Sequence, residues 1–265
     1  MEAQTVNKQS GIPAELFDTH LSRCIPQFSV DCVTLGFHSG MLKVLLCKMN
    51  MFRKWMLPGG FVFHDECVDE AAVRILEGRT SLQNVYLRQF YLFGHKNRQP
   101  KEEADKILDL LQVDNPEKHW LRRRFLSVGY YALVESGKVQ VEGNGMEELD
   151  WFCLHELPEL YLDHDHIIEK AIQSIRNDVG YIPIGYELLP PKFTMPELRT
   201  IYETILGREL DRRNFQRKML STGLIAPLNE TRKEGAYKSP NLYSFNKEKY
   251  IEARQQGMQL MHIIL

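Results

Sequence analysis

The sequence has no uninterrupted apolar run close to the roughly 18 to 20 residues that a membrane-spanning helix needs. Its first 20 residues contain no basic region followed by an apolar one, so we expect no export signal. The five cysteines are scattered and never form a CxxC pair, which argues against a zinc knuckle or a disulfide framework. No internal repeat or low-complexity tract is evident. These absences predict a globular protein of the reducing cytoplasm.

What is present is enough for one large domain or two modest ones, since 43% of the 265 residues are hydrophobic and 26% are charged. Strand-like and helix-like segments alternate over residues 25–160, and the pattern changes near residue 162. We therefore predict an N-terminal segment (1–24), a first domain (25–160), a connecting helix and linker (161–191), and a second domain (192–265). The expected fold class is α+β.

Within the first domain, β-rich runs at residues 28–37 and 42–48 predict a hairpin. Further strands are expected at 85–94, 125–134, 138–141 and 149–154. Residues 68–76 carry apolar side chains at helical spacing, so we predict a helix there. The charged stretch at 101–121 reads as a partly helical insertion. A helix from Asp163 to Val179 follows; it is a candidate for dimer contact and for transmission between domains, or simply a packed connector.

The C-terminal block predicts two helices followed by a hairpin. Thr194 and Glu197 have the spacing of a capping box, and Gly207 ends the first helix. Asp211 is the expected N-cap of the second helix, which Gly223 ends. Strands are expected around 224–228 and 241–245, with a basic loop between them. Helix, turn, basic helix and β-ribbon is the order of a winged helix-turn-helix.

The charge distribution supports this interpretation. Residues 191–250 hold 12 Lys and Arg against 7 Asp and Glu, a balance of +5, whereas the rest of the chain holds 21 against 28. A basic block on an acidic body indicates a polyanionic partner, although such a block can also be an ordinary solvated surface. A basic helix fits the DNA major groove, where arginine pairs with guanine and asparagine with adenine, and wing lysines and arginines contact phosphates.

Residues 60–82 resemble the Nudix box, whose pattern is GX5EX7REUXEEXGU, with U a bulky aliphatic residue. Gly60, Glu66 and Arg74 match its glycine, first glutamate and arginine, and Leu76 and Leu82 match its aliphatic positions. Read from the residues alone, Gly60 permits a tight turn and Glu66 and Arg74 hold each other in place, or these residues contact a ligand.

The box departs from its pattern where active Nudix enzymes bind a divalent cation. The three later glutamate positions of the pattern are occupied by Ile75, Gly78 and Arg79, and the position of its last glycine is occupied by Ser81. An isoleucine supplies no oxygen ligand, a glycine has no side chain, and an arginine repels a cation. We therefore expect no metal, no cofactor and no metal-dependent hydrolysis.

The chain as a whole resembles the Nudix-related transcriptional regulators of the NrtR type over roughly residues 28–245. The segments FYLFGHKNRQP and RFLSVGYYALV carry this resemblance in the first half, and residues 180–225 and YKSPNLYSF carry it in the second. It implies a Nudix-like α/β/α sandwich that senses an effector, followed by a winged helix. It also implies effector-binding residues at Gly60, Glu66, Arg74 and Arg98.

Our hypothesis is a bacterial regulator of carbohydrate or NAD metabolism, acting as a homodimer on operator DNA. The effector would be a sugar, a sugar phosphate or ADP-ribose; the insertion and the lost acidic cluster favour the first two. The predicted DNA-binding residues are Lys192, Thr194, Arg212, Arg213, Asn214, Arg217, Lys218, Arg232, Lys233 and Lys238. The alternatives are a Nudix hydrolase acting on ADP-ribose or a related nucleoside diphosphate, and a pure interaction protein.

Overall fold

The structure, a computed structural model, describes residues 22–50, 53–80, 82, 85–98, 100–110, 117, 119–139, 147–180, 184–232 and 240–256. The chain forms two compact units. The first comprises Met1–Thr34, Val44–Ala132 and Val139–Ala171, and the second comprises Leu35–Lys43, Leu133–Lys138 and Ile172–Leu265. The division falls inside one helix, α4 (His164–Asp178). The boundaries at residues 160 and 191 that the sequence suggested stay predictions.

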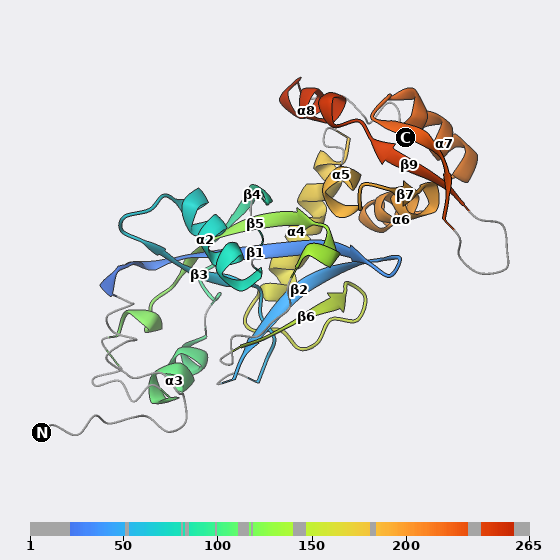
Figure 1. Cartoon of the computed structure of the whole chain (residues 1–265). Coiled ribbons are helices and arrows are strands. Elements are labelled where there is room, and N and C mark those ends of the chain that lie inside the picture. The colour runs from blue at the N-terminus through green and yellow to red at the C-terminus, as the bar shows by residue number, and fades with distance from the viewer. Residues whose placement is uncertain are drawn as a thin grey trace, which may run out of the picture. The chain divides into compact units, whose positions relative to one another are not determined.

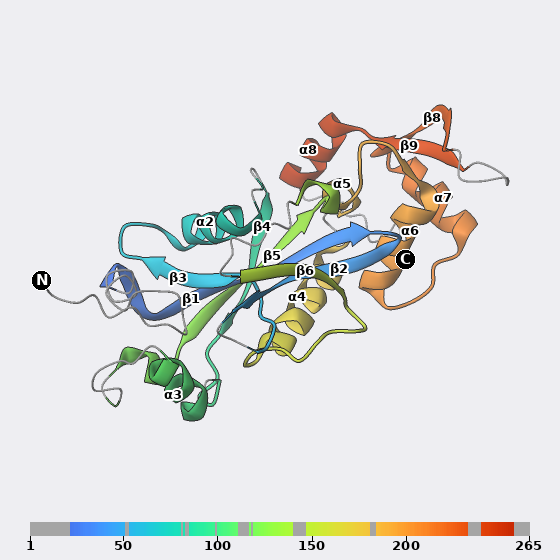
Figure 2. The ribbon, with the colours of Figure 1, turned by 60° about the horizontal axis from the view of Figure 1, so that its bottom comes forward.

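A six-stranded sheet forms the centre of the Nudix-like part, with strand order β4-β5-β1-β2-β6 and β3 paired antiparallel to β1. Its strands are β1 (Cys24–His38), β2 (Met41–Met49), β3 (Gly59–Phe63), β4 (Tyr86–Phe93), β5 (Leu126–Val134) and β6 (Glu147–Cys153). Helices α2 (Val68–Thr80) and α4 lie on opposite faces of this sheet (Figures 1 and 2). The predicted α/β/α sandwich is therefore confirmed.

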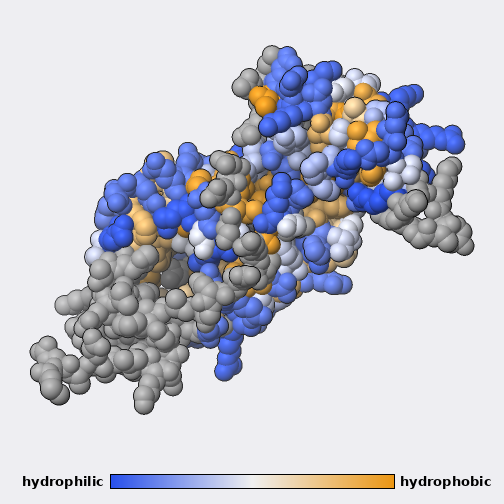
Figure 3. Space-filling view, viewed as in Figure 1, coloured by the Kyte–Doolittle hydropathy of each residue, from blue (hydrophilic) through white to orange (hydrophobic). Residues whose placement is uncertain are grey.

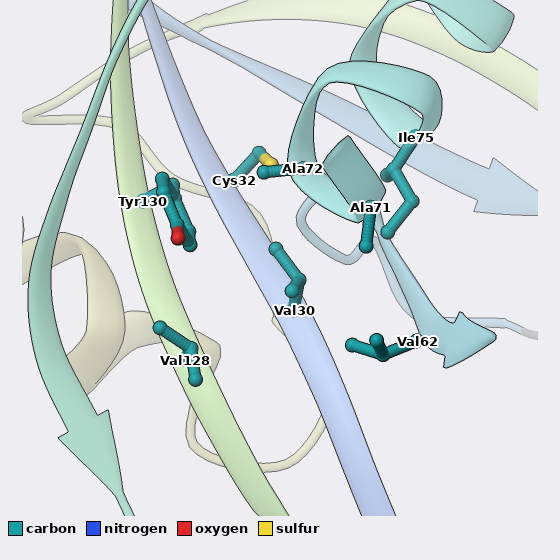
Figure 4. Close-up of a cluster of buried hydrophobic side chains, with 8 residues drawn as sticks. All are labelled: Val30, Cys32, Val62, Ala71, Ala72, Ile75, Val128 and Tyr130. Carbon is teal, nitrogen blue, oxygen red and sulfur yellow. The ribbon is translucent and has the colours of Figure 1, made fainter. Parts of the chain in front are cut away.

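Successive side chains of β1 point to opposite faces of the sheet, and both faces are buried from Val30 to Leu35. Val30 and Cys32 are fully buried in one cluster with Ala71, Ala72 and Ile75 of α2, and the Cys32 side chain lies beside Ala72 (Figure 4). Val62 of β3 and Tyr130 of β5 complete this cluster. Asp31, between Val30 and Cys32, must point to the opposite face, where its carboxylate meets polar partners described below. One buried strand thus supplies both the core and a polar centre.

The insertion at 101–121 contains helix α3 (Lys101–Leu110) and overlaps a 3-10 turn, η2 (Trp120–Arg122). Leu108 and Leu121 are buried together with Phe125 in a small second core. The Trp120 ring lies 5.2 Å from that of Phe61 in β3. The strand predicted at 138–141 is wrong at its first two residues, because Lys138 closes a second 3-10 turn, η3 (Ser136–Lys138), and Val139 belongs to no strand. Residues 140 and 141 lie outside the described part.

The second unit contains a winged helix. Its elements are α5 (Gly185–Leu188), β7 (Phe193–Thr194), α6 (Met195–Leu206), α7 (Arg212–Ser221), β8 (Ile225–Thr231), β9 (Asn241–Phe245) and α8 (Lys247–Gln256). The three strands pair in the order β7-β9-β8 (Figure 1). The Tyr202 ring of α6 lies 5.5 Å from that of Phe215 of α7, in the core between the two helices. The predicted winged helix-turn-helix is confirmed.

Three elements of the winged helix were not predicted. Helix α5 lies in the stretch expected to be a linker, the short strand β7 precedes α6, and α8 follows the wing. The ends of the two central helices agree with the sequence. Gly207 has φ 68° and Gly223 has φ 65°, left-handed conformations that favour glycine.

In the space-filling view, hydrophilic residues cover most of the visible face and hydrophobic ones form scattered patches between them (Figure 3). Among the described residues, none of the helices combines the length and the apolar character that crossing a membrane requires.

Candidate functional site

The surviving half of the Nudix box forms a tight ion pair. Arg74 donates from Nε to Glu66 Oε2 at 2.8 Å and from Nη2 to Glu66 Oε1 at 2.5 Å. Its Nη2 also donates to the Phe61 carbonyl at 2.9 Å, and the Phe63 amide donates to Glu66 Oε1 at 2.8 Å. The hydrogen bond from Arg74 is the main reason why the pKa of the Glu66 carboxyl lies below its ordinary value. The pair thereby fixes the end of β3 to helix α2.

Gly60 has a different role from the tight turn that the sequence suggested. It lies inside β3, opposite Val30, with no left-handed backbone conformation. A Cβ added at this position would lie 3.2 Å from two carbons of the Ile75 side chain. The glycine therefore allows the strand and helix α2 to approach closely.

The metal positions of the box do not fit a metal. Ile75 is 5% exposed and belongs to the hydrophobic core, and Gly78 offers no ligand atom. Arg79 donates from Nη1 to Cys47 Sγ at 3.1 Å and lies 3.6 Å from a Glu147 oxygen. Ser81 lies outside the described residues. Within the described part of the chain, no three His, Cys, Asp or Glu side chains are placed to hold an ion.

Arg98, a predicted effector-binding residue, lies at the centre of a buried polar cluster. Its Nε donates to both oxygens of Asp163, at 3.0 and 2.8 Å, and its Nη2 donates to Asp31 Oδ2 at 3.0 Å. Ser127 Oγ donates to the same Asp31 oxygen at 2.5 Å. The Arg98 residue is only 8% exposed. Its Nη1 is buried and makes no hydrogen bond within the described residues, and a role of Arg98 in effector binding stays a prediction.

His164 belongs to the same cluster. Burial lowers its pKa, so the ring is neutral at neutral pH. Its Nδ1 accepts a hydrogen bond from the Leu57 amide at 2.8 Å, and its Nε2 lies 3.9 Å from Asp31 Oδ1. Sequence reasoning missed Asp31, Ser127 and His164. The one available signal was the charged Asp31 inside the apolar run SVDCV of a predicted strand.

In the winged helix, α7 presents the predicted basic face. Phe215 and Met219 are buried, with Phe215 against Tyr202 of α6, and Arg212 and Arg213 are exposed. Within the described part of the chain, these two arginines have no hydrogen-bond or ion-pair partner. Two further members of the predicted set bond each other, since Arg217 donates to Asn214 Oδ1 at 2.8 Å. Lys218 is half-buried.

The other predicted DNA-binding residues differ in accessibility. Thr194 is 5% exposed, and its hydroxyl is the N-cap of α6 in a capping box with Glu197. Its side chain is therefore occupied, which argues against the predicted contact with the DNA backbone. Lys192 pairs with Glu230 at 2.6 Å. Lys233 and Lys238 lie outside the described residues, and they stay predictions.

Arg232 connects the wing to the start of α6. It donates to Glu197 Oε1 at 2.7 Å and to the Lys192 carbonyl at 3.1 Å. Glu197 also accepts hydrogen bonds from the Thr194 amide and hydroxyl, at 2.7 and 2.9 Å. Burial alone would raise the pKa of the Glu197 carboxyl, but these hydrogen bonds outweigh it and lower the pKa. Arg232 therefore links the wing to the first turn of α6, and its predicted contact with a DNA phosphate stays a prediction.

The hydrogen bonds to Glu197 predict that the stability of the protein depends on pH. Because the folded pKa of Glu197 is lowered, its contribution is present above the unfolded pKa and is lost as the pH falls through the folded value. We expect Glu197→Gln to lower the free energy of unfolding by about 1–2 kcal/mol at pH 7, and by less near pH 3.5. Urea unfolding at both pH values measures this. A difference from wild type that grows on acidification would contradict it. Glu230→Gln, at an exposed wing carboxylate, is the control.

The comparisons with known proteins agree with both the Nudix-like fold of the N-terminal part and the winged helix of the C-terminal part. The NUDIX domain family matches residues 26–171, and the NrtR DNA-binding winged helix domain family matches residues 185–245. The ADPR responsive transcriptional repressor NtrR of Acinetobacter baylyi is 27% identical over 232 residues, covering 85% of this chain and 84% of the relative. The ADP-ribose pyrophosphatase of Methanocaldococcus jannaschii is 29% identical over 134 residues, 49% of this chain and 66% of that enzyme.

Solved structures show the same architecture. Shewanella oneidensis NrtR in complex with a 27mer DNA has a TM-score of 0.66 at 24% identity, over 85% of this chain and 96% of that one. A MutT/nudix family protein from Enterococcus faecalis has a TM-score of 0.58 at 22% identity, over 91% of this chain and 96% of that one. The chain therefore belongs to the Nudix family, as an NrtR-type regulator in which a Nudix domain precedes a winged-helix DNA-binding domain.

Proposed function

We propose that this protein represses transcription by binding operator DNA through α7 and that it releases or retains the DNA in response to a small metabolite. The observation that carries the DNA-binding part is the pair of exposed arginines on α7, Arg212 and Arg213, which have no partner within the described residues. A side chain already held in an ion pair must break that pair before it can contact DNA. These two guanidinium groups are available at no such cost.

The effector that we propose first is ADP-ribose. The relative from Acinetobacter baylyi is named an ADPR responsive repressor, and the similarity to it extends over 85% of this chain. A sugar or a sugar phosphate remains the alternative. Because Ile75, Gly78 and Arg79 supply no metal ligands, the effector would bind without a divalent cation and without being cleaved. A ligand that survives binding suits a sensor, since hydrolysis would destroy the signal.

We also propose that the regulator acts as a cytoplasmic homodimer on a pseudo-palindromic site, with two α7 helices about one turn of the duplex apart. Helix α4 is the candidate for coupling, because its residues belong to both compact units. The effector must have different affinities for the DNA-binding and the non-binding arrangement; otherwise it cannot shift the balance between them.

The test is binding of labelled duplex from upstream of the protein's own and neighbouring genes, compared with scrambled duplex at about 150 mM salt. We expect Arg213→Ala and Arg217→Ala each to weaken specific binding about tenfold or more, since one base contact is worth about 1–3 kcal/mol. Lys247→Ala, an exposed lysine on α8, should bind as wild type does. Folded arginine variants with unchanged affinity would contradict these contacts. Wild-type binding that ignores sequence would contradict the operator proposal itself.

A hydrolase is the second candidate, because the pyrophosphatase from Methanocaldococcus jannaschii resembles about half of this chain. It requires magnesium-dependent turnover of ADP-ribose that is lost in Glu66→Gln. We expect no turnover above background, and we expect ADP-ribose to change the affinity for DNA equally with magnesium and with a chelator. Turnover that depends on Glu66 would overturn the non-catalytic assignment while leaving DNA binding intact.

A further inference from the structure

A concave site of about 220 Å³ lies in the winged helix where three elements meet. We call it the α6–α7–β9 notch. The residues that line it are Met195, Pro196, Arg199, Arg212, Gln216, Pro240, Asn241 and Tyr243. The first three belong to the start of α6, the next two to α7, and the last three to β9 and the residue before it. The notch joins the basic helix to the wing, so any ligand in it lies beside α7.

The notch carries two guanidinium groups that retain unused hydrogen-bonding capacity. Arg212 has no hydrogen-bond or ion-pair partner within the described residues. Arg199 lies 3.3 Å from Glu203 Oε1 as an ion pair, but its buried Nε makes no hydrogen bond. That Glu203 oxygen already accepts from the Leu210 amide at 2.9 Å. The Nε atom itself is enclosed, but the Arg199 side chain is 28% exposed and its two Nη groups make no hydrogen bond within the described residues. An anion in the notch would give these groups a partner.

A third donor comes from β9. The Tyr243 hydroxyl accepts a hydrogen bond from Gln216 Nε2 at 3.1 Å, and the tyrosine residue is 5% exposed. Since a phenol both accepts and donates, this hydroxyl still has its own proton to give, and no acceptor for it lies within the described residues. Gln216 thus holds the hydroxyl in place at the wall of the notch. Two cations and an oriented O–H donor are the chemistry that recognises an oxyanion.

The position of the notch indicates which oxyanion. When a recognition helix enters the major groove, the elements on either side of it meet the sugar-phosphate backbone. Arg199 and Tyr243 come from those flanking elements, α6 and β9. We propose that the α6–α7–β9 notch binds one backbone phosphate of the DNA duplex, held by Arg199, Arg212 and Tyr243. This inference rests on the proposed function, and it adds three positioning contacts, two of which the sequence did not suggest.

The test compares Arg199→Ala and Tyr243→Phe with Arg208→Ala, an exposed arginine of the same domain that does not line the notch. Binding to both upstream and scrambled duplex is measured over a range of salt concentrations. Because a phosphate contact carries no sequence information, each notch variant should weaken both duplexes about equally, by roughly three- to tenfold at low salt. Arg199→Ala should also reduce the salt slope by about 0.9, the value for one phosphate. Arg208→Ala should leave affinity for both duplexes close to that of wild type.

Single methylphosphonate substitutions, which remove the charge of one phosphate, identify the contact directly. One substitution should weaken wild type but not Arg199→Ala, since the interaction is already lost in the variant. An Arg199→Ala variant with wild-type affinity and salt slope would overturn the proposal, as would a loss confined to the upstream duplex, which indicates base reading. The proposed function fails by a different result, namely wild type that does not prefer the upstream duplex. Even in that case, the affinities of wild type and Arg199→Ala for the scrambled duplex still show whether the notch binds a phosphate.

Discussion

Replacing Arg98 with alanine should lower the free energy of unfolding by about 3–5 kcal/mol, the largest effect that we expect from one substitution in this chain. The guanidinium is paired with Asp31 and Asp163, whose side chains are 10% and 25% exposed. Its removal leaves the Asp31 carboxylate buried without its cation, with the Ser127 hydroxyl as its remaining hydrogen-bond donor within the described residues. Desolvation of a charge that is no longer neutralised is the physical cost.

Urea unfolding of the isolated variant measures this loss. Lys106→Ala is the matched control, because it removes a cation from an exposed pair with Glu103 and should change stability by less than about 1 kcal/mol. A loss below about 1 kcal/mol for Arg98→Ala would show that the cluster is solvated in solution. A stable variant with weakened effector binding would instead restore Arg98 to the effector site that the sequence suggested.

Introducing a carboxylate at the first metal position should destabilise the protein without creating an enzyme. We expect Ile75→Glu to lower the free energy of unfolding by about 3 kcal/mol or more, because the position is buried in the hydrophobic core and lies against Gly60. Val73 provides the control, since it lies on the same helix and is 40% exposed. Val73→Glu should stay within about 0.5 kcal/mol of wild type.

Urea unfolding gives the two stabilities, and a magnesium-dependent assay with ADP-ribose gives the activity. If Ile75→Glu were as stable as Val73→Glu, the side chain at this position would have access to solvent and the site would be nearer to an active box than the structure indicates. Turnover in Ile75→Glu alone would lead to the same conclusion.

The features that could be predicted from the sequence depend on residues that lie close together along the chain. The Glu66–Arg74 pair and the capping box of Thr194 and Glu197 join residues eight and three positions apart, so their spacing is visible in the chain. The capping box itself shows the limit of this reasoning. The same Thr194 was also assigned to DNA, because spacing does not reveal that its hydroxyl is buried.

The polar cluster could not be predicted because sheet register and loop path create it. Arg98 meets Asp31 across 67 positions and Asp163 across 65, and no local pattern records such distances. The notch has the same origin, since Arg199, Gln216 and Tyr243 come from α6, α7 and β9. Helix α5 was missed for another reason, since the prolines around Gly185–Leu188 favour extended structure and the helix is only four residues long.

The contact of Arg232 with Glu197 has a consequence for local unfolding. Arg232 also closes the base of the wing, because its amide donates to the Pro240 carbonyl at 3.1 Å. If the base of the wing opens, Glu197 loses its cation, and the cap of α6 loses part of its support. We therefore expect the wing base and the first turn of α6 to open and close as one cooperative unit, although 35 positions separate Arg232 from Glu197. Duplex DNA that immobilises either segment would consequently also slow the opening of the other.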